Sequence, residues 1–93
     1  MIIGTMIVEA TLYEASSLKA KRSVVKSIST RIKQKYNVSI AETGHQEAWQ
    51  RVQWSIVSVG NQRKLVEAEL ERSLALIESS AELEVIHVQR EMV

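Results

Sequence analysis

Apolar and polar residues alternate at the start of the chain. The odd positions of this stretch include Thr5, Glu9 and Thr11, whereas the even positions read Ile2, Gly4, Met6, Val8, Ala10 and Leu12. A period of two that is rich in β-branched residues predicts a long strand over residues 2–12. Ile3 and Ile7 lie on the odd face, so we expect both faces to be at least partly covered near the start of this strand.

The next segment changes to helical periodicity. Apolar residues recur there with no Gly or Pro between them, at Leu18, Val25, Ile28, Ile32 and Tyr36. Ser16 and Ser17 are candidate N-caps, and Asn37 is a candidate left-handed terminator. This spacing predicts a helix from about Ser17 to Tyr36.

The pattern then predicts a hairpin, a second helix and a last strand. Val38–Thr43 reads as a short strand, Gly44–Glu47 as the connection, and about Trp49–Val59 as its partner. Apolar residues lie on both faces of that partner, so its core-facing side stays open between two sets: Val52, Trp54 and Ile56, or Val57 and Val59. A helix over about Gln62–Ser80 follows, and the last strand begins at Leu83 and becomes polar at Gln89.

The resulting order, β-α-β-β-α-β, predicts an α+β fold. With right-handed crossovers its simplest closed form is a ferredoxin-like sandwich, in which four antiparallel strands carry two helices on one face. We expect residues 1–93 to form one domain of this kind. The other sheet face would be open and would carry Ile3, Ile7 and some of Trp54, Ile56, Val57, Ile86 and Val88. An open apolar face of this kind is typical of an interface, and a homodimer is its simplest explanation.

Composition excludes several classes of protein. The chain has 93 residues and no Cys, which excludes disulfides, thiol nucleophiles and all-thiolate zinc sites. The apolar opening is too short and lacks the basic flank of a signal peptide, and no stretch reaches the length of a membrane span. We therefore expect a cytoplasmic protein.

Charge becomes informative once it is divided by element. The totals are 12 basic and 11 acidic residues, a net charge of +1. The first predicted helix, however, holds seven basic residues and no acidic one: Lys19, Lys21, Arg22, Lys26, Arg31, Lys33 and Lys35. Helical periodicity places Lys19, Arg22, Lys26 and Lys33 in one stripe along its flank. Lys21 and Lys35 fall near the buried face, where we expect their stems to pack and their ammonium groups to reach water.

Two interpretations of this basic helix remain open. Cations in the first turn oppose the helix dipole, and together with Ser17 and free backbone N–H groups they attract phosphate. The functional interpretation is a docking surface for RNA phosphates or an acidic protein, formed by Ser17, Lys19, Lys21, Arg22, Lys26 and Lys33. The alternative is a solvated basic face that the glutamates of the second helix balance.

A second polar cluster surrounds the hairpin connection. It comprises Glu42, His45, Gln46, Trp49, Gln50 and Arg51. Glu42 and His45 could form an acid–base pair, or a metal site with Glu47, but their spacing fits no specific motif. The competing interpretation is structural: the polar residues hydrogen-bond one another and the Trp packs on the sheet edge. His87, on the last strand, we expect to be a sheet-face histidine and not a ligand.

Known motifs of the predicted fold are missing. An RNA-recognition motif needs aromatic residues on its central strands, where only Trp54 is a candidate. An acylphosphatase needs an Arg-bearing loop after the first strand, where this chain reads Tyr13-Glu14-Ala15-Ser16. No nucleotide-binding, catalytic-serine or paired-Cys motif occurs. We expect no catalytic residues, no metal and no cofactor.

Three segments nevertheless resemble one family, the small bacterial YlxP family of uncharacterised proteins. They are Ser17–Ile28 (SLKAKRSVVKSI), Asn37–Glu42 (NVSIAE), and His45-Gln46 with Trp49-Gln50-Arg51. The resemblance runs over essentially the whole chain and implies a ferredoxin-like fold. It also implies a setting among translation and ribosome-maturation factors, beside the gene for ribosome-binding factor A, but no catalytic activity.

The positions that the family marks are the basic helix start, with Leu18, Lys19, Lys21, Arg22 and Lys26, and the hairpin cluster. This chain departs from the family at Trp54 and at Gly44, where an acidic residue is frequent, so a metal or acid–base role for the hairpin loses one carboxylate. The basic helix and the setting that the resemblance implies together predict a non-enzymatic module that docks ribosomal RNA or a ribosome-associated complex through its first helix. The alternative is a homodimeric protein-interaction adaptor that uses the open sheet face and binds no nucleic acid.

Overall fold

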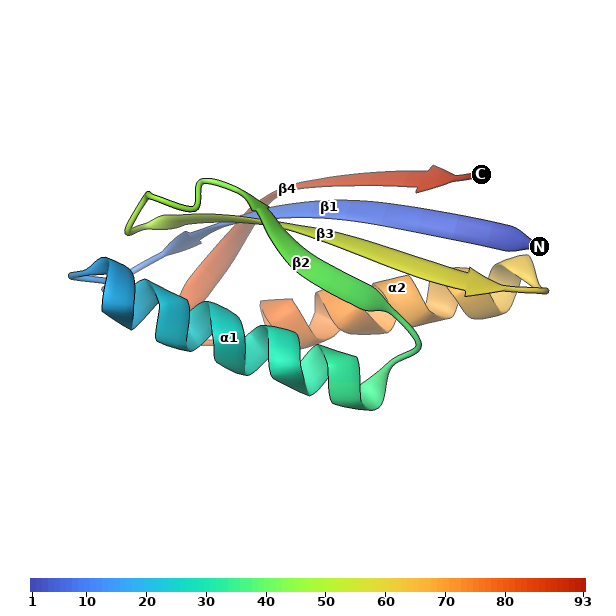
Figure 1. The fold of residues 1–93 in the computed structure, drawn as a ribbon, viewed down its shortest axis with the longest axis horizontal. Helices are drawn as coiled ribbons and strands as arrows, with labels where there is room; N and C mark the ends of the chain where they lie inside the picture. The colour runs from blue at the N-terminus through green and yellow to red at the C-terminus, as the bar shows by residue number, and fades with distance from the viewer.

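The computed structural model describes residues 1–93 as one antiparallel sheet with two helices against one of its faces (Figure 1). The strand order is β2-β3-β1-β4. This arrangement confirms the predicted ferredoxin-like fold. The elements are β1 (Ile2–Leu12), α1 (Leu18–Lys35), β2 (Ser39–Gly44), β3 (Arg51–Gly60), α2 (Arg63–Glu78) and β4 (Leu83–Met92).

The register between β1 and β3 settles which face of each strand enters the core. Val8 of β1 lies opposite Trp54 of β3, and both are fully buried against the helices. Trp54 also donates its Nε1–H to the hydroxyl of Ser29 on α1 over 3.1 Å. Ile56 is buried on the same face. The expectation that Trp54 or Ile56 lies on the open face is therefore wrong, because pairing with β1 places their set inward.

The open face carries a smaller apolar set than the sequence suggested. Ile3 pairs with Val59, which is 47% exposed, and Val57 on the same face is 39% exposed. Val88 instead lies opposite Val8 on the helix side and packs against the core, so its expected place on the open face is wrong. Ile86 sits where the β1–β4 register shifts and is 47% exposed.

The helix ends are set by local hydrogen bonds. Ser17 is the N-cap of α1, and its hydroxyl accepts the N–H of Ala20 over 3.1 Å. The helix ends with Tyr36 in an extended conformation, so the prediction of a left-handed Asn37 is wrong. Asn37 instead donates its side-chain amide to the carbonyl of Val59 over 3.1 Å, which secures the turn into β2. Neither helix is long and apolar enough to cross a membrane.

The two ends of the chain lie beside each other, because β1 and β4 are neighbours (Figure 1). The N–H of Val93 donates to the carbonyl of Ile3 over 2.7 Å, and the reverse bond measures 3.3 Å. The β2–β3 loop and the start of α1 lie at the opposite end of the molecule.

Candidate functional site

A buried lysine joins the two sets of residues that the sequence singled out. Lys21, on the first turns of α1, has no exposed surface, and its Nζ lies 2.7 Å from Glu42 Oε2. The same ammonium donates to the carbonyls of His45 over 2.7 Å and Gln46 over 3.3 Å. The expectation that Lys21 reaches water is therefore wrong, since two carbonyls inside the protein accept its hydrogen bonds and the carboxylate of Glu42 pairs with its charge. Lys35, by contrast, is exposed.

The β2–β3 loop is held in place by contacts on several sides. His45 has a φ of 57° and places its Nε2 3.1 Å from Glu9 Oε1 of β1. Gln46 donates its side-chain amide to the carbonyl of Glu42 over 3.1 Å, and the N–H of Ala48 donates to the carbonyl of His45 over 3.0 Å. Together with Lys21, these bonds tie the loop to both α1 and β1.

Glu42 and His45 do not form the acid–base pair that the sequence suggested. Glu42 faces Lys21, and His45 faces Glu9, a partner 36 positions away that no local pattern could reveal. No three side chains of His, Asp or Glu gather as a metal site requires. The contacts that Glu42 and His45 do make join the β2–β3 hairpin to α1 and to β1.

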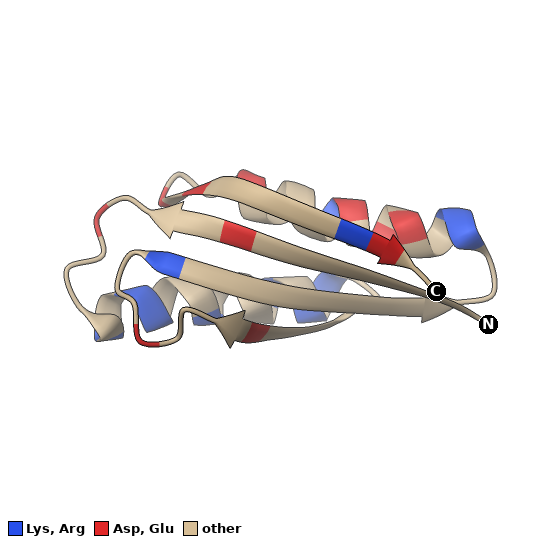
Figure 2. Ribbon diagram, turned by 90° about the horizontal axis from the view of Figure 1, so that it is seen from above, with Lys and Arg blue, Asp and Glu red and all other residues tan.

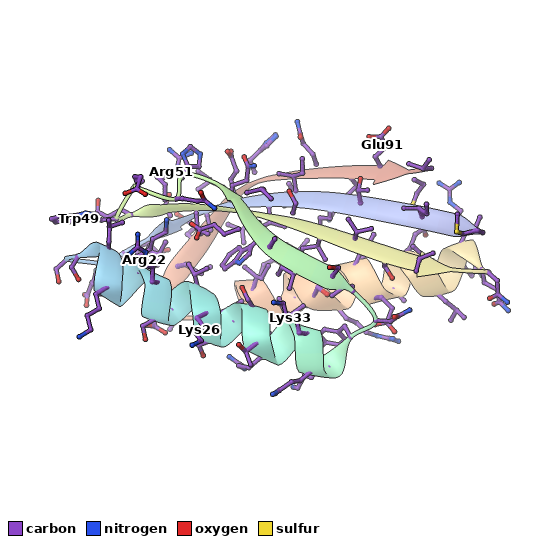
Figure 3. All side chains as sticks on the ribbon, viewed as in Figure 1. Arg22, Lys26, Lys33, Trp49, Arg51 and Glu91 are labelled. Atoms are coloured by element: carbon purple, nitrogen blue, oxygen red, sulfur yellow. The ribbon has the colours of Figure 1, made fainter.

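The rest of the hairpin cluster lies at the end of the sheet. Trp49 has 52% of its surface exposed. Gln50 is exposed and accepts the N–H of Leu12 at its carbonyl over 3.0 Å, and Arg51 begins β3 opposite Thr11. Figure 3 shows Trp49, Arg51 and Arg22 at the same end of the molecule.

The remaining basic residues of α1 form an exposed surface, defined here as the basic surface: Lys19, Arg22, Lys26, Arg31, Lys33 and Lys35. In Figure 2 the visible parts of α1, behind β2 and β3, carry blue and no red. None of them takes part in the four ion pairs of the chain. The structure thus leaves the expected stripe of Lys19, Arg22, Lys26 and Lys33 exposed and unpaired.

Two glutamates of α2 form ion pairs, and neither pair involves α1. Glu67 pairs with Arg63 on its own helix over 2.8 Å, and Glu71 binds Arg90 of β4 through two bonds of 2.8 and 2.9 Å. The hydrogen bond from Arg90 lowers the pKa of Glu71 below its ordinary value, and the same bond raises the pKa of Arg90. No ion pair links α2 to α1, so direct pairing does not neutralise the basic surface.

The largest cavity does not extend the basic surface. It measures about 620 Å³ and lies between the end of β1, the first turns of α1 and the turn before β4. Apolar side chains such as Leu12 and Val24 line it together with Glu14 and Glu82. Two carboxylates in its lining oppose the entry of an anion.

Comparisons with known proteins identify the family. A family model described as "Protein of unknown function (DUF503)" matches residues 3–90. The chain belongs to this family. The uncharacterised protein YlxP of Bacillus subtilis (strain 168) is 47% identical to it over 83 residues, which cover 89% of the chain and 90% of that relative. The predicted kinship with the YlxP family is thus confirmed.

Solved structures agree on the fold of this DUF503 chain. The de novo designed protein Foldit4 matches with a TM-score of 0.56 and 17% identity, over 100% of the chain and 97% of that protein. A dimeric ferredoxin-like protein from an uncultured marine organism matches with a TM-score of 0.52 and 13% identity, over 100% and 96%. At these identities the likeness concerns the fold alone.

Proposed function

We propose that this DUF503 protein is a non-enzymatic module that binds ribosomal RNA through the basic surface of α1. The observation that carries the proposal is that α1 has no acidic residue and that its six exposed basic side chains form no ion pair. Lysine and arginine side chains arranged in this way are the usual ligands of backbone phosphates.

The charge distribution also suggests how the contact is oriented. The net charge is only +1, so the molecule as a whole has little attraction for a polyanion. The positive potential is concentrated on α1, whereas the paired glutamates lie on α2. RNA should therefore approach through the helix layer at α1, and phosphate contacts alone give affinity without reading sequence.

Filter binding to a fragment of small-subunit ribosomal RNA at several salt concentrations tests the proposal. With four phosphate contacts, log K should fall against log salt with a slope of about 3 to 4. The substitutions Arg22→Glu and Lys26→Glu together should weaken binding and flatten the slope. The matched control is Lys64→Glu with Arg72→Glu, which reverses two exposed charges on α2. Binding that is absent, or equally sensitive to both double variants, would refute the proposal.

A second candidate function, self-association through the open sheet face, is favoured by one observation. Val57 and Val59 are exposed there, next to Ile3, and no helix covers them. The marine ferredoxin-like neighbour is described as dimeric. Light scattering over a range of concentrations should find a dimer that Val59→Glu dissociates and Leu65→Glu, on the helix layer, does not. A wild-type protein that stays monomeric at high concentration would rule this candidate out.

A further inference from the structure

We propose that the RNA is bound as an unpaired strand, with one base stacked on Trp49 and the neighbouring phosphate held by Arg22. This inference rests on the proposed function and adds the form of RNA that the site accepts. It uses two features that the basic surface alone does not explain: an exposed indole, and a buried lysine that fixes the loop carrying it.

The exposure of Trp49 is the first observation. The chain has two Trp residues, and one of them, Trp54, is fully buried in the core. Trp49 leaves 52% of its surface in water. Tyr13 leaves 56%, and it lies nearby because its neighbour Leu12 is hydrogen-bonded to Gln50. Large aromatic rings are usually buried in folded domains. Two exposed rings at one end of a small protein therefore indicate a binding surface.

The position of Trp49 relative to α1 is the second observation. Lys21 binds the carbonyls of His45 and Gln46, so the first turns of α1 lie directly against the loop that leads to Trp49. Arg22 is the next residue on α1, is exposed and makes no ion pair. Figure 3 shows Arg22 and Trp49 at the same end, one from the helix and one from the loop. An exposed aromatic ring and an unpaired cation at the same end of the molecule are the components of single-strand binding sites.

The set of contacts that hold the loop is the third observation. Its shape is fixed by the Lys21 ammonium, by the contact between His45 and Glu9, by one bond within the loop and by one bond from Gln46 to β2. An indole held on such a loop loses little conformational freedom when a base stacks on it. The buried lysine thus acts on the ligand indirectly, as a positioning residue for Trp49.

These observations favour an unpaired strand over a duplex. In an A-form duplex each base is stacked between its neighbours and offers no free face, so the helix presents only phosphates and the minor groove. An unpaired base can leave its neighbours and cover the indole. The single strand should therefore bind more tightly than a duplex of the same sequence, by about 5-fold to 150-fold for one stacked base.

The test compares a single-stranded RNA of about 12 nucleotides with the same strand annealed to its complement. This length lets several phosphates of the RNA contact the basic surface. Binding of the single strand should quench the fluorescence of Trp49, and Trp49→Phe should abolish that change because the remaining Trp54 is buried. Trp49→Ala should lower the affinity for the single strand at least 5-fold, and Trp49→Phe should retain most of it. Leu65→Ala, which shortens another exposed apolar side chain, is the matched control.

The outcomes separate this inference from the proposed function. Equal affinity for the two forms of RNA, with no quenching and no effect of Trp49→Ala, would overturn the inference and leave the proposed function standing. Failure of both RNA forms to bind would overturn the proposed function as well. A third outcome is that neither RNA binds, whereas polyglutamate binds and quenches the fluorescence of Trp49. That outcome would assign the site to an acidic protein and overturn both the inference and the proposed function.

Discussion

Replacing Lys21 by methionine would show how much the buried ion pair stabilises the contact between α1 and the β2–β3 loop. Methionine keeps the length of the side chain and suits a helix, but it removes the ammonium. The carbonyls of His45 and Gln46 would then lose their donor, and the Glu42 carboxylate would lose the charge it pairs with.

The expected cost follows from the burial of the two partners. Removing one member of a buried ion pair costs about 3 to 5 kcal/mol, because the other charge is left without a partner. The side chain of Glu42 retains 19% of its exposure, so water can reach part of this side chain. We therefore expect Lys21→Met to lower the free energy of unfolding by about 3 kcal/mol, at the lower end of that range.

Urea unfolding followed by circular dichroism measures this change. Lys26→Met, an exposed lysine on the same helix, is the control and should stay within about 0.5 kcal/mol of the wild type. Adding Glu42→Gln to Lys21→Met should recover part of the loss, since the unpaired charge is then removed. A Lys21→Met protein as stable as the control, with effects additive to those of Glu42→Gln, would refute the reasoning.

Three further predictions concern the core and the surface of the helix layer. Gly4→Ala should destabilise the protein by about 1 to 3 kcal/mol in thermal unfolding, because the added methyl would lie 2.8 Å from a methyl group of Leu70; an unchanged midpoint would contradict this. Trp54→Phe removes a buried hydrogen bond and leaves a small cavity, so its urea midpoint should fall by the equivalent of about 1 to 3 kcal/mol, and a neutral effect would speak against the packing described. Arg90 lowers the pKa of Glu71, so this carboxylate contributes stability above its unfolded-state pKa and loses it as pH falls through the folded-state value. Glu71→Gln should therefore cost less than about 1 kcal/mol at pH 7, the pair being half exposed, and nothing at a pH below the folded-state pKa; a difference that persists in acid would contradict this.

The parts of the fold that sequence predicted well are those with a strong local period. The alternation at the start of the chain gave the bounds of β1, because every second side chain enters the core. β3 was ambiguous because both of its faces are apolar, and only its register against β1, with Val8 opposite Trp54, decided the matter.

The candidate site was predictable in composition but not in geometry. Helical periodicity placed Lys21 near the buried face of α1, yet its acceptors lie more than twenty residues away in the β2–β3 loop. The partner of His45, Glu9, is equally remote in sequence. Contacts of this kind depend on how α1 and the loop pack on the sheet. The hydrophobic periodicity of the sequence does not predict that packing.

The adjacency of the two chain ends determines how the molecule would respond to a mechanical load. β1 and β4 are antiparallel neighbours whose outer ends meet at Ile3 and Val93. The bonds of an antiparallel ladder run perpendicular to the strands, so a force that separates the termini would load them one after another. The hydrogen bonds between β1 and β4 would therefore break in sequence at low force, from Val93 toward the turn before Leu83. Almost no tension would reach β2, β3 and α1.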